Sequence, residues 1–99
     1  MEKGPNLFEM QRRLAPVFDR YGIARAVVFG SVAKGTATER SDLDLLVDSH
    51  LRGLRFVGFV EDVHQAAGIP VDVFDVSHIE PGSRIAREIR TTGVTIYEK

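Results

Sequence analysis

The stretch that decides the fold is residues 29–47, which read FGSVAKGTATERSDLDLLV. The apolar run 26–29 leads into Gly30, and its β-branched and aromatic side chains predict a buried strand. Residues 30–41 carry glycine, serine and threonine and predict a connection. Leucine and valine then dominate residues 43–47, which predict a second strand interrupted by acidic side chains.

Before this stretch, the apolar spacing predicts one helix between Asn6 and Gly22. Asn6 suits the N-cap with Glu9 three residues later, and Gly22 suits a left-handed C-cap. Pro16 lacks a backbone donor, so we expect it to kink or split this helix. Residues 1–5 are expected to form a loose tail of a single domain spanning residues 1–99.

After residue 47, helices and strands continue to alternate. Helical spacing from Leu54 to Ala67 predicts a helix that ends at Gly68, with its core face formed by Leu54, Val57, Val60, Val63 and Ala67. A strand is expected over 71–76, a helix from Pro81 to Gly93 and a last strand over 94–97. The fold class is therefore α+β with an α/β-like order, in which helices pack on a small mixed sheet of about four strands.

Composition excludes several classes of protein. The 99 residues contain no cysteine, which excludes disulfides and thiolate zinc sites and suits the cytoplasm. No apolar run is long enough to span a membrane. The net charge of -1 speaks against a domain that binds nucleic acid directly.

The turn after the first strand has the chemistry of a phosphate seat. Gly30 lets backbone donors approach an anion, Ser31 adds a hydroxyl donor, and Lys34 adds a positive charge one turn later. Lys34 could equally be an ordinary surface lysine.

Asp42 and Asp44 are the stronger signal, because a spacing of two places both carboxylates on one face of a strand. Hard oxygen ligands of this kind suit Mg²⁺. Asp72 in the third strand offers a third carboxylate, with Asp75 as its competitor. By alternation these two point to opposite faces, so at most one of them belongs to the site.

Together these motifs resemble the nucleotidyltransferase superfamily related to DNA polymerase β, and in particular its minimal nucleotidyltransferases. The resemblance rests on Gly30-Ser31, a spacer of ten residues, Asp42-Leu43-Asp44 and a later strand with a carboxylate. It implies the polymerase β-like fold, two Mg²⁺ ions held by Asp42, Asp44 and Asp72 as catalytic carboxylates, and a nucleotide held at Gly30, Ser31 and Lys34. Lysine at position 34 departs from the arginine common in the family and loses its bidentate fork.

Minimal nucleotidyltransferases are often paired with HEPN-type toxins, so the resemblance implies an antitoxin that transfers AMP from ATP to a partner hydroxyl, with tyrosine as the expected acceptor. Two alternatives stay open: a binding antitoxin that masks its partner without catalysis, and nucleotidyl transfer to a small molecule. The second needs room for the acceptor, which a homo-oligomer could supply.

Overall fold

Four short strands build a mixed sheet in the computed structural model, which describes residues 4–99. The strands are β1 (Arg25–Phe29), β2 (Leu43–Asp48), β3 (Val71–Asp75) and β4 (Val94–Glu98), in the spatial order β3-β2-β1-β4. β1 runs antiparallel to β2 and β4, whereas β2 and β3 are parallel because a helix crosses between them. The predicted fold class, a small mixed four-stranded sheet with helices packed on it, is confirmed.

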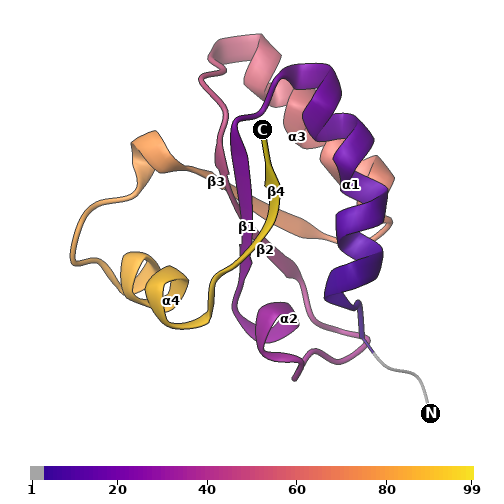
Figure 1. Cartoon of the computed structure of the whole chain (residues 1–99), viewed down its shortest axis with the longest axis vertical. Coiled ribbons are helices and arrows are strands. Elements are labelled where there is room, and N and C mark those ends of the chain that lie inside the picture. Colours follow the sequence, from indigo (N-terminus) through magenta and orange to yellow (C-terminus); the bar gives the residue numbers. More distant parts are fainter. Residues whose placement is uncertain (1–3) are drawn as a thin grey trace.

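The helices cover the sheet unequally. They are α1 (Leu7–Tyr21), α2 (Ser31–Lys34), α3 (Gly53–Ala67) and α4 (Arg84–Thr92), with the short 3₁₀ turn η1 (Val76–His78) after β3. Figure 1 shows α1 and α3 side by side against one face, α4 on the other side of the sheet and α2 beyond the end of β1. The face toward α4 is therefore only partly covered.

α1 begins and ends as the sequence predicts. The Asn6 side chain accepts a hydrogen bond from the Glu9 amide at 2.7 Å, and Gly22 takes the left-handed conformation with a φ of 68°. The expectation that Pro16 splits the helix is wrong, since α1 is one helix of 15 residues. Pro16 is exposed, so its ring disturbs no buried contact.

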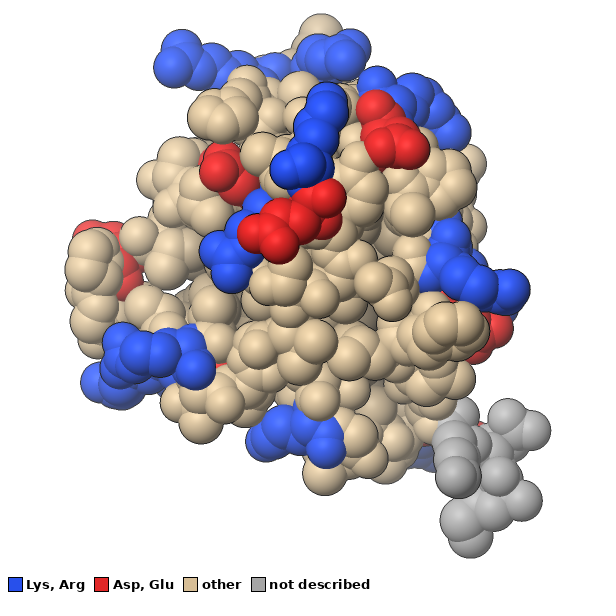
Figure 2. All heavy atoms as spheres, viewed as in Figure 1, with Lys and Arg blue, Asp and Glu red and all other residues tan. Residues whose placement is uncertain are grey.

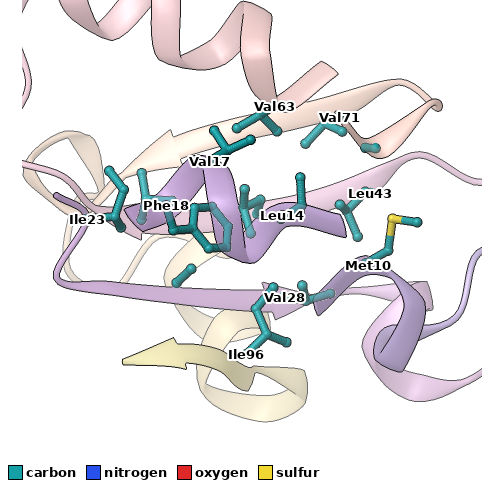
Figure 3. Close-up of a cluster of buried hydrophobic side chains, with 14 of the residues drawn as sticks. Met10, Leu14, Val17, Phe18, Ile23, Val28, Leu43, Val63, Val71 and Ile96 are labelled. Carbon is teal, nitrogen blue, oxygen red and sulfur yellow. The ribbon is translucent and has the colours of Figure 1, made fainter. Parts of the chain in front are cut away.

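The main core lies between the sheet and the pair α1 and α3. Figure 3 shows Leu14 and Phe18 of α1 facing Val28, Leu43 and Ile96 of the sheet. A smaller cluster occupies the opposite face, where α4 packs; its members are Val27, Phe29, Leu46, Phe74, Ile79, Ile85 and Ile89. Burial of both faces fixes the register of the strands.

The predicted core face of α3 is partly wrong. Leu54 is 88% exposed and Val57 61% exposed, whereas Phe59 and Val63 are fully buried. Two overlapping sets of apolar residues fit helical spacing here, and the face turned toward α1 and the sheet is the one that contains Phe59. The N-terminal half of the expected core stripe lies in solvent instead.

The start of α4 and part of the N-terminal tail differ from the expectations. Pro81 does not open α4, because the helix begins at Arg84 after Ser83, whose side chain accepts a hydrogen bond from the Ala86 amide at 3.1 Å. Residues 1–3 of the expected tail lie outside the described residues, while Gly4 is half-buried against the backbone of Thr38.

None of the helices in residues 4–99 combines the length and apolarity that a membrane span requires.

Candidate active site

Asp44 and Asp72 meet on the face of the sheet that α4 only partly covers. They are register partners in the parallel pair of β2 and β3, so their side chains share one face. Leu46 and Phe74, two residues further along each strand, identify that face as the one that packs against α4. The structure thus brings together two of the predicted carboxylates from strands 28 residues apart in sequence.

Asp42 lies at the entry to β2, directly before the strand. The preceding loop is closed by hydrogen bonds in both directions: Thr38 N donates to Ser41 Oγ at 2.8 Å, and Ser41 N donates to Thr38 O at 3.0 Å. The Leu43 amide then donates to Pro70 O at 3.0 Å, which joins the starts of β2 and β3. Asp42 is consequently held, exposed, near the end of the sheet that carries Asp44 and Asp72.

Gly30 is required by its contact with Asp44. It adopts φ 79° and ψ −151°, a region open essentially to glycine alone. A Cβ built at this position would lie 2.6 Å from Asp44 Oδ2. Glycine here therefore allows the Asp44 carboxylate to lie directly against the turn that leads into Ser31.

Ser31 is the first residue of α2, half-buried, and it directly follows Gly30. The first amides of a helix have no acceptor within it, so the amides that follow Gly30 are suited to an anion together with the Ser31 hydroxyl. Lys34 is exposed at the end of α2, lines a cavity of about 490 Å³ with residues 4–7, and forms no ion pair within residues 4–99. In that part of the chain, no hydrogen bond or ion pair joins Lys34 to the carboxylates.

The site concentrates negative charge around Asp44. Burial raises the pKa of the Asp44 carboxyl above its ordinary value, and the charges of Asp72 and Glu88 raise it further. Asp42 acts in the same direction. An arrangement of like charges around a half-buried carboxylate favours the arrival of a cation.

Glu88 and Thr92 of α4 are residues of this site that sequence reasoning missed. The charge of Glu88 raises the pKa of Asp44, and the Thr92 hydroxyl accepts a hydrogen bond from the Gly30 amide at 2.8 Å. Both interactions join residues far apart in the chain. Only the strand order, which seats α4 over β1, could have revealed them.

Asp75 has a separate, structural role. It is 6% exposed, and its two oxygens accept hydrogen bonds from the amides and hydroxyls of Ser49 and Ser77 at 2.6–3.1 Å. Burial alone would raise the pKa of Asp75, but these four hydrogen bonds lower it below the ordinary value. Asp72, and not Asp75, therefore shares the face of Asp44, as strand alternation predicts.

The carboxylates fit Mg²⁺ as part of a coordination shell. Within residues 4–99, no three acidic or histidine side chains converge closely enough to hold an ion by themselves. Mg²⁺ commonly takes one or two protein carboxylates and completes its octahedron with waters and substrate phosphates. Asp44 and Asp72, which are register partners on one sheet face, suit that arrangement, and Asp42 lies directly before β2.

The chain is similar to known proteins of one family. The family model for polymerase beta nucleotidyltransferases matches residues 12–99. A Methanocaldococcus jannaschii protein assigned to the protein adenylyltransferases is 32% identical over 78 residues, which cover 77% of this chain and 84% of that protein. The protein adenylyltransferase MntA of Thermococcus cleftensis is 33% identical over 75 residues, which cover 72% and 76% respectively.

Solved structures share the fold at low sequence identity. A toxin–antitoxin crystallised with AMP-PNP superposes with a TM-score of 0.74 at 17% identity, covering 90% of this chain and 73% of that chain. A complex of a tri-AMPylated Shewanella oneidensis HEPN toxin with an MNT antitoxin gives a TM-score of 0.67 at 14% identity, covering 91% and 71%. With the family match over residues 12–99, these findings show that the chain belongs to the polymerase β-type nucleotidyltransferase family.

Proposed function

We propose that this protein is an antitoxin that transfers AMP from ATP, in the presence of Mg²⁺, to a side-chain hydroxyl of a HEPN-type toxin. The observation that carries the proposal is that Asp44 and Asp72 are register partners on one sheet face, with Asp44 against the turn of Gly30 and Ser31 and with Asp42 directly before β2. Carboxylates beside a phosphate seat are the groups that nucleotidyl transfer requires.

The relatives support the choice of donor and acceptor. Two proteins at 32% and 33% identity are described as protein adenylyltransferases. Among the structural neighbours, one holds AMP-PNP and another contains an AMPylated HEPN toxin. ATP as donor and a HEPN-type protein as acceptor are therefore the substrates that we assign to this site.

The bond changes of the proposed reaction follow from this assignment. The acceptor oxygen attacks the α-phosphorus of ATP, a new O–P bond forms, and the bond to the leaving pyrophosphate breaks. Ser31 and the first amides of α2 would hold the departing phosphates. Asp72, the exposed member of the carboxylate pair, would orient the acceptor hydroxyl and take its proton.

Asp42 and Asp44 would hold Mg²⁺, with Asp72 as a further ligand. When bound, the metal supplies positive charge that neutralises the phosphates and stabilises the charge that develops during transfer. Burial and the charges of Asp72, Glu88 and Asp42 raise the pKa of Asp44, so a bound cation would stabilise the charged form of this carboxylate.

The openness of the site supports a protein acceptor. Asp42 and Asp72 are both exposed, so α4 does not bury either side chain. Figure 2 shows basic side chains over the part of the surface where α4 lies, and side chains of both signs elsewhere in the same view. A tyrosine on a projecting segment of a partner could reach such a site, and we assign tyrosine as the acceptor.

Two labelled forms of ATP test the reaction. With a HEPN-type toxin and Mg²⁺, label on the α-phosphate should become bound to the toxin, and label on the γ-phosphate should appear in pyrophosphate. Asp44→Asn should abolish both. Transfer of the γ-label to the toxin would indicate a kinase instead, and inhibition of the toxin without any bound label would favour simple masking of the partner.

A further inference from the structure

Thr92 ends α4 and touches the proposed site at one atom. Its hydroxyl accepts the hydrogen bond of the Gly30 amide at 2.8 Å and donates its own proton to Glu88 O at 2.8 Å. Gly30 is buried and Thr92 half-buried, so this hydrogen bond is partly screened from water. The Gly30 amide is thereby committed to α4 and is not free to bind a phosphate.

The same glycine lies directly against Asp44. A Cβ added to Gly30 would fall 2.6 Å from Asp44 Oδ2, and Ser31 is the next residue along the chain. The hydrogen bond to Thr92 therefore holds the backbone of Gly30, which lies between Ser31 and the Asp44 carboxylate. A small displacement of Gly30 would move Ser31 relative to Asp44.

α4 itself is held by few contacts, which makes the hydrogen bond important. No residue of α4 is fully buried, and the helix packs on the sheet mainly through half-buried Ile85 and Ile89. Beyond those apolar contacts, the bond from Gly30 to Thr92 is the side-chain hydrogen bond that joins α4 to the sheet within residues 4–99.

We propose that Thr92 is a positioning residue for nucleotidyl transfer. By accepting a hydrogen bond from the Gly30 amide, Thr92 holds the turn before Ser31 in its position beside Asp44. The expected loss of kcat rests on the proposed function, whereas the expected protection of the Gly30 amide rests on the geometry alone. Thr92 acts through Gly30 and does not touch the nucleotide.

Thr91 provides a matched control. Its hydroxyl donates to Arg87 O at 2.8 Å, the same kind of bond within the helix that Thr92 makes, but Thr91 is exposed and the Gly30 amide donates to Thr92 instead. Thr92→Val should lower the kcat for AMP transfer ~10- to 100-fold, as expected for a misplaced catalytic group, with little change in KM for the toxin. Thr92→Ser should retain most of the wild-type kcat, and Thr91→Val all of it.

Amide hydrogen exchange at Gly30 tests the geometry without relying on activity. In the wild-type protein this amide should be protected, in Thr92→Val it should exchange at least ~10-fold faster, and Thr92→Ser should restore the protection. Equal kcat in Thr92→Val and wild type would overturn the positioning role. An unprotected Gly30 amide in the wild-type protein would overturn it even if Thr92→Val failed to fold. If wild type transfers no AMP but Gly30 is protected through Thr92, the proposed function fails and the hydrogen bond stands.

Discussion

At the scale of single residues, two glycines and two aspartates show that residues of the same type have different roles in this fold. Gly30 and Gly35 both have positive φ, at 79° and 77°, yet only Gly30 of these two lies against another side chain. Asp44 is half-buried and Asp75 buried, yet burial and neighbouring carboxylates raise the pKa of Asp44, whereas serine donors lower the pKa of Asp75. The environment, and not the residue type, decides what each does.

Gly30→Ala should destabilise the protein more than Gly35→Ala, which has nothing within 4 Å of its Cβ position. The left-handed conformation alone costs about 1–2 kcal/mol for alanine at Gly35. At Gly30 the rarer backbone region and the contact with Asp44 should add about 1–3 kcal/mol. Denaturant unfolding of both variants measures the difference, and equal losses would show that the contact with Asp44 is easily relieved.

Asp44→Asn should stabilise the metal-free protein at neutral pH. Folding raises the pKa of Asp44, so the protonated Asp44 contributes to the free energy of unfolding below about pH 4. This contribution is lost as the pH rises through the pKa of Asp44 in the folded protein. The amide carries no charge and avoids this loss, so its Tm in EDTA at pH 7 should exceed that of wild type by a few degrees. Glu39→Gln, an exposed loop variant that removes the same charge, should leave Tm unchanged. A lower Tm for Asp44→Asn would contradict the repulsion inferred among these carboxylates.

Asp75→Asn should show the opposite sign. The lowered pKa of Asp75 means that its contribution is present above about pH 4 and is lost as the pH falls through the folded-state value. Removing the charge that accepts four hydrogen bonds should cost about 2–3 kcal/mol at pH 7. The difference in unfolding free energy between the two proteins should therefore narrow as the pH falls from 7 to 3. A constant difference across this range would mean that the charge of Asp75 is not what stabilises the loop.

At the scale of elements, alternation along strands is the part of the fold that the sequence predicts best. Placing Asp72 and Asp75 on opposite faces requires only the period of a strand, and the register of β2 with β3 agrees. Helices allow more than one solution. Both the stripe with Leu54 and Val57 and the stripe with Phe59 fit helical spacing in α3, and the choice depends on how α1 packs against it.

Substitutions in α3 test this assignment of faces. Phe59→Ala should destabilise the fold by about 3–5 kcal/mol, because the ring is fully buried against Phe18 and Tyr21. Leu54→Ala should change stability by less than about 0.5 kcal/mol, since the side chain is 88% exposed. Similar losses in both variants would show that α3 is rotated in solution relative to the structure.

At the scale of the whole molecule, the predicted site was incomplete for a topological reason. Local motifs were sufficient to single out Gly30, Asp42, Asp44 and Asp72, although the pairing of their strands comes from the structure. Glu88 and Thr92 reach the site only because β4 returns to pair with β1 and carries α4 to the open face. No local pattern specifies that return, so these two residues could not be assigned before the strand order was known.

The central claim is that this fold inactivates its partner by covalent transfer of AMP, and intact-mass spectrometry of the partner tests it most directly. A HEPN-type toxin is incubated with the protein, ATP and Mg²⁺, in parallel with the Asp42→Asn/Asp44→Asn variant. We predict that the toxin gains the mass of one AMP or a whole multiple of it with the wild-type protein, and gains nothing with the double variant. A toxin that is inhibited at its unchanged mass would contradict the account.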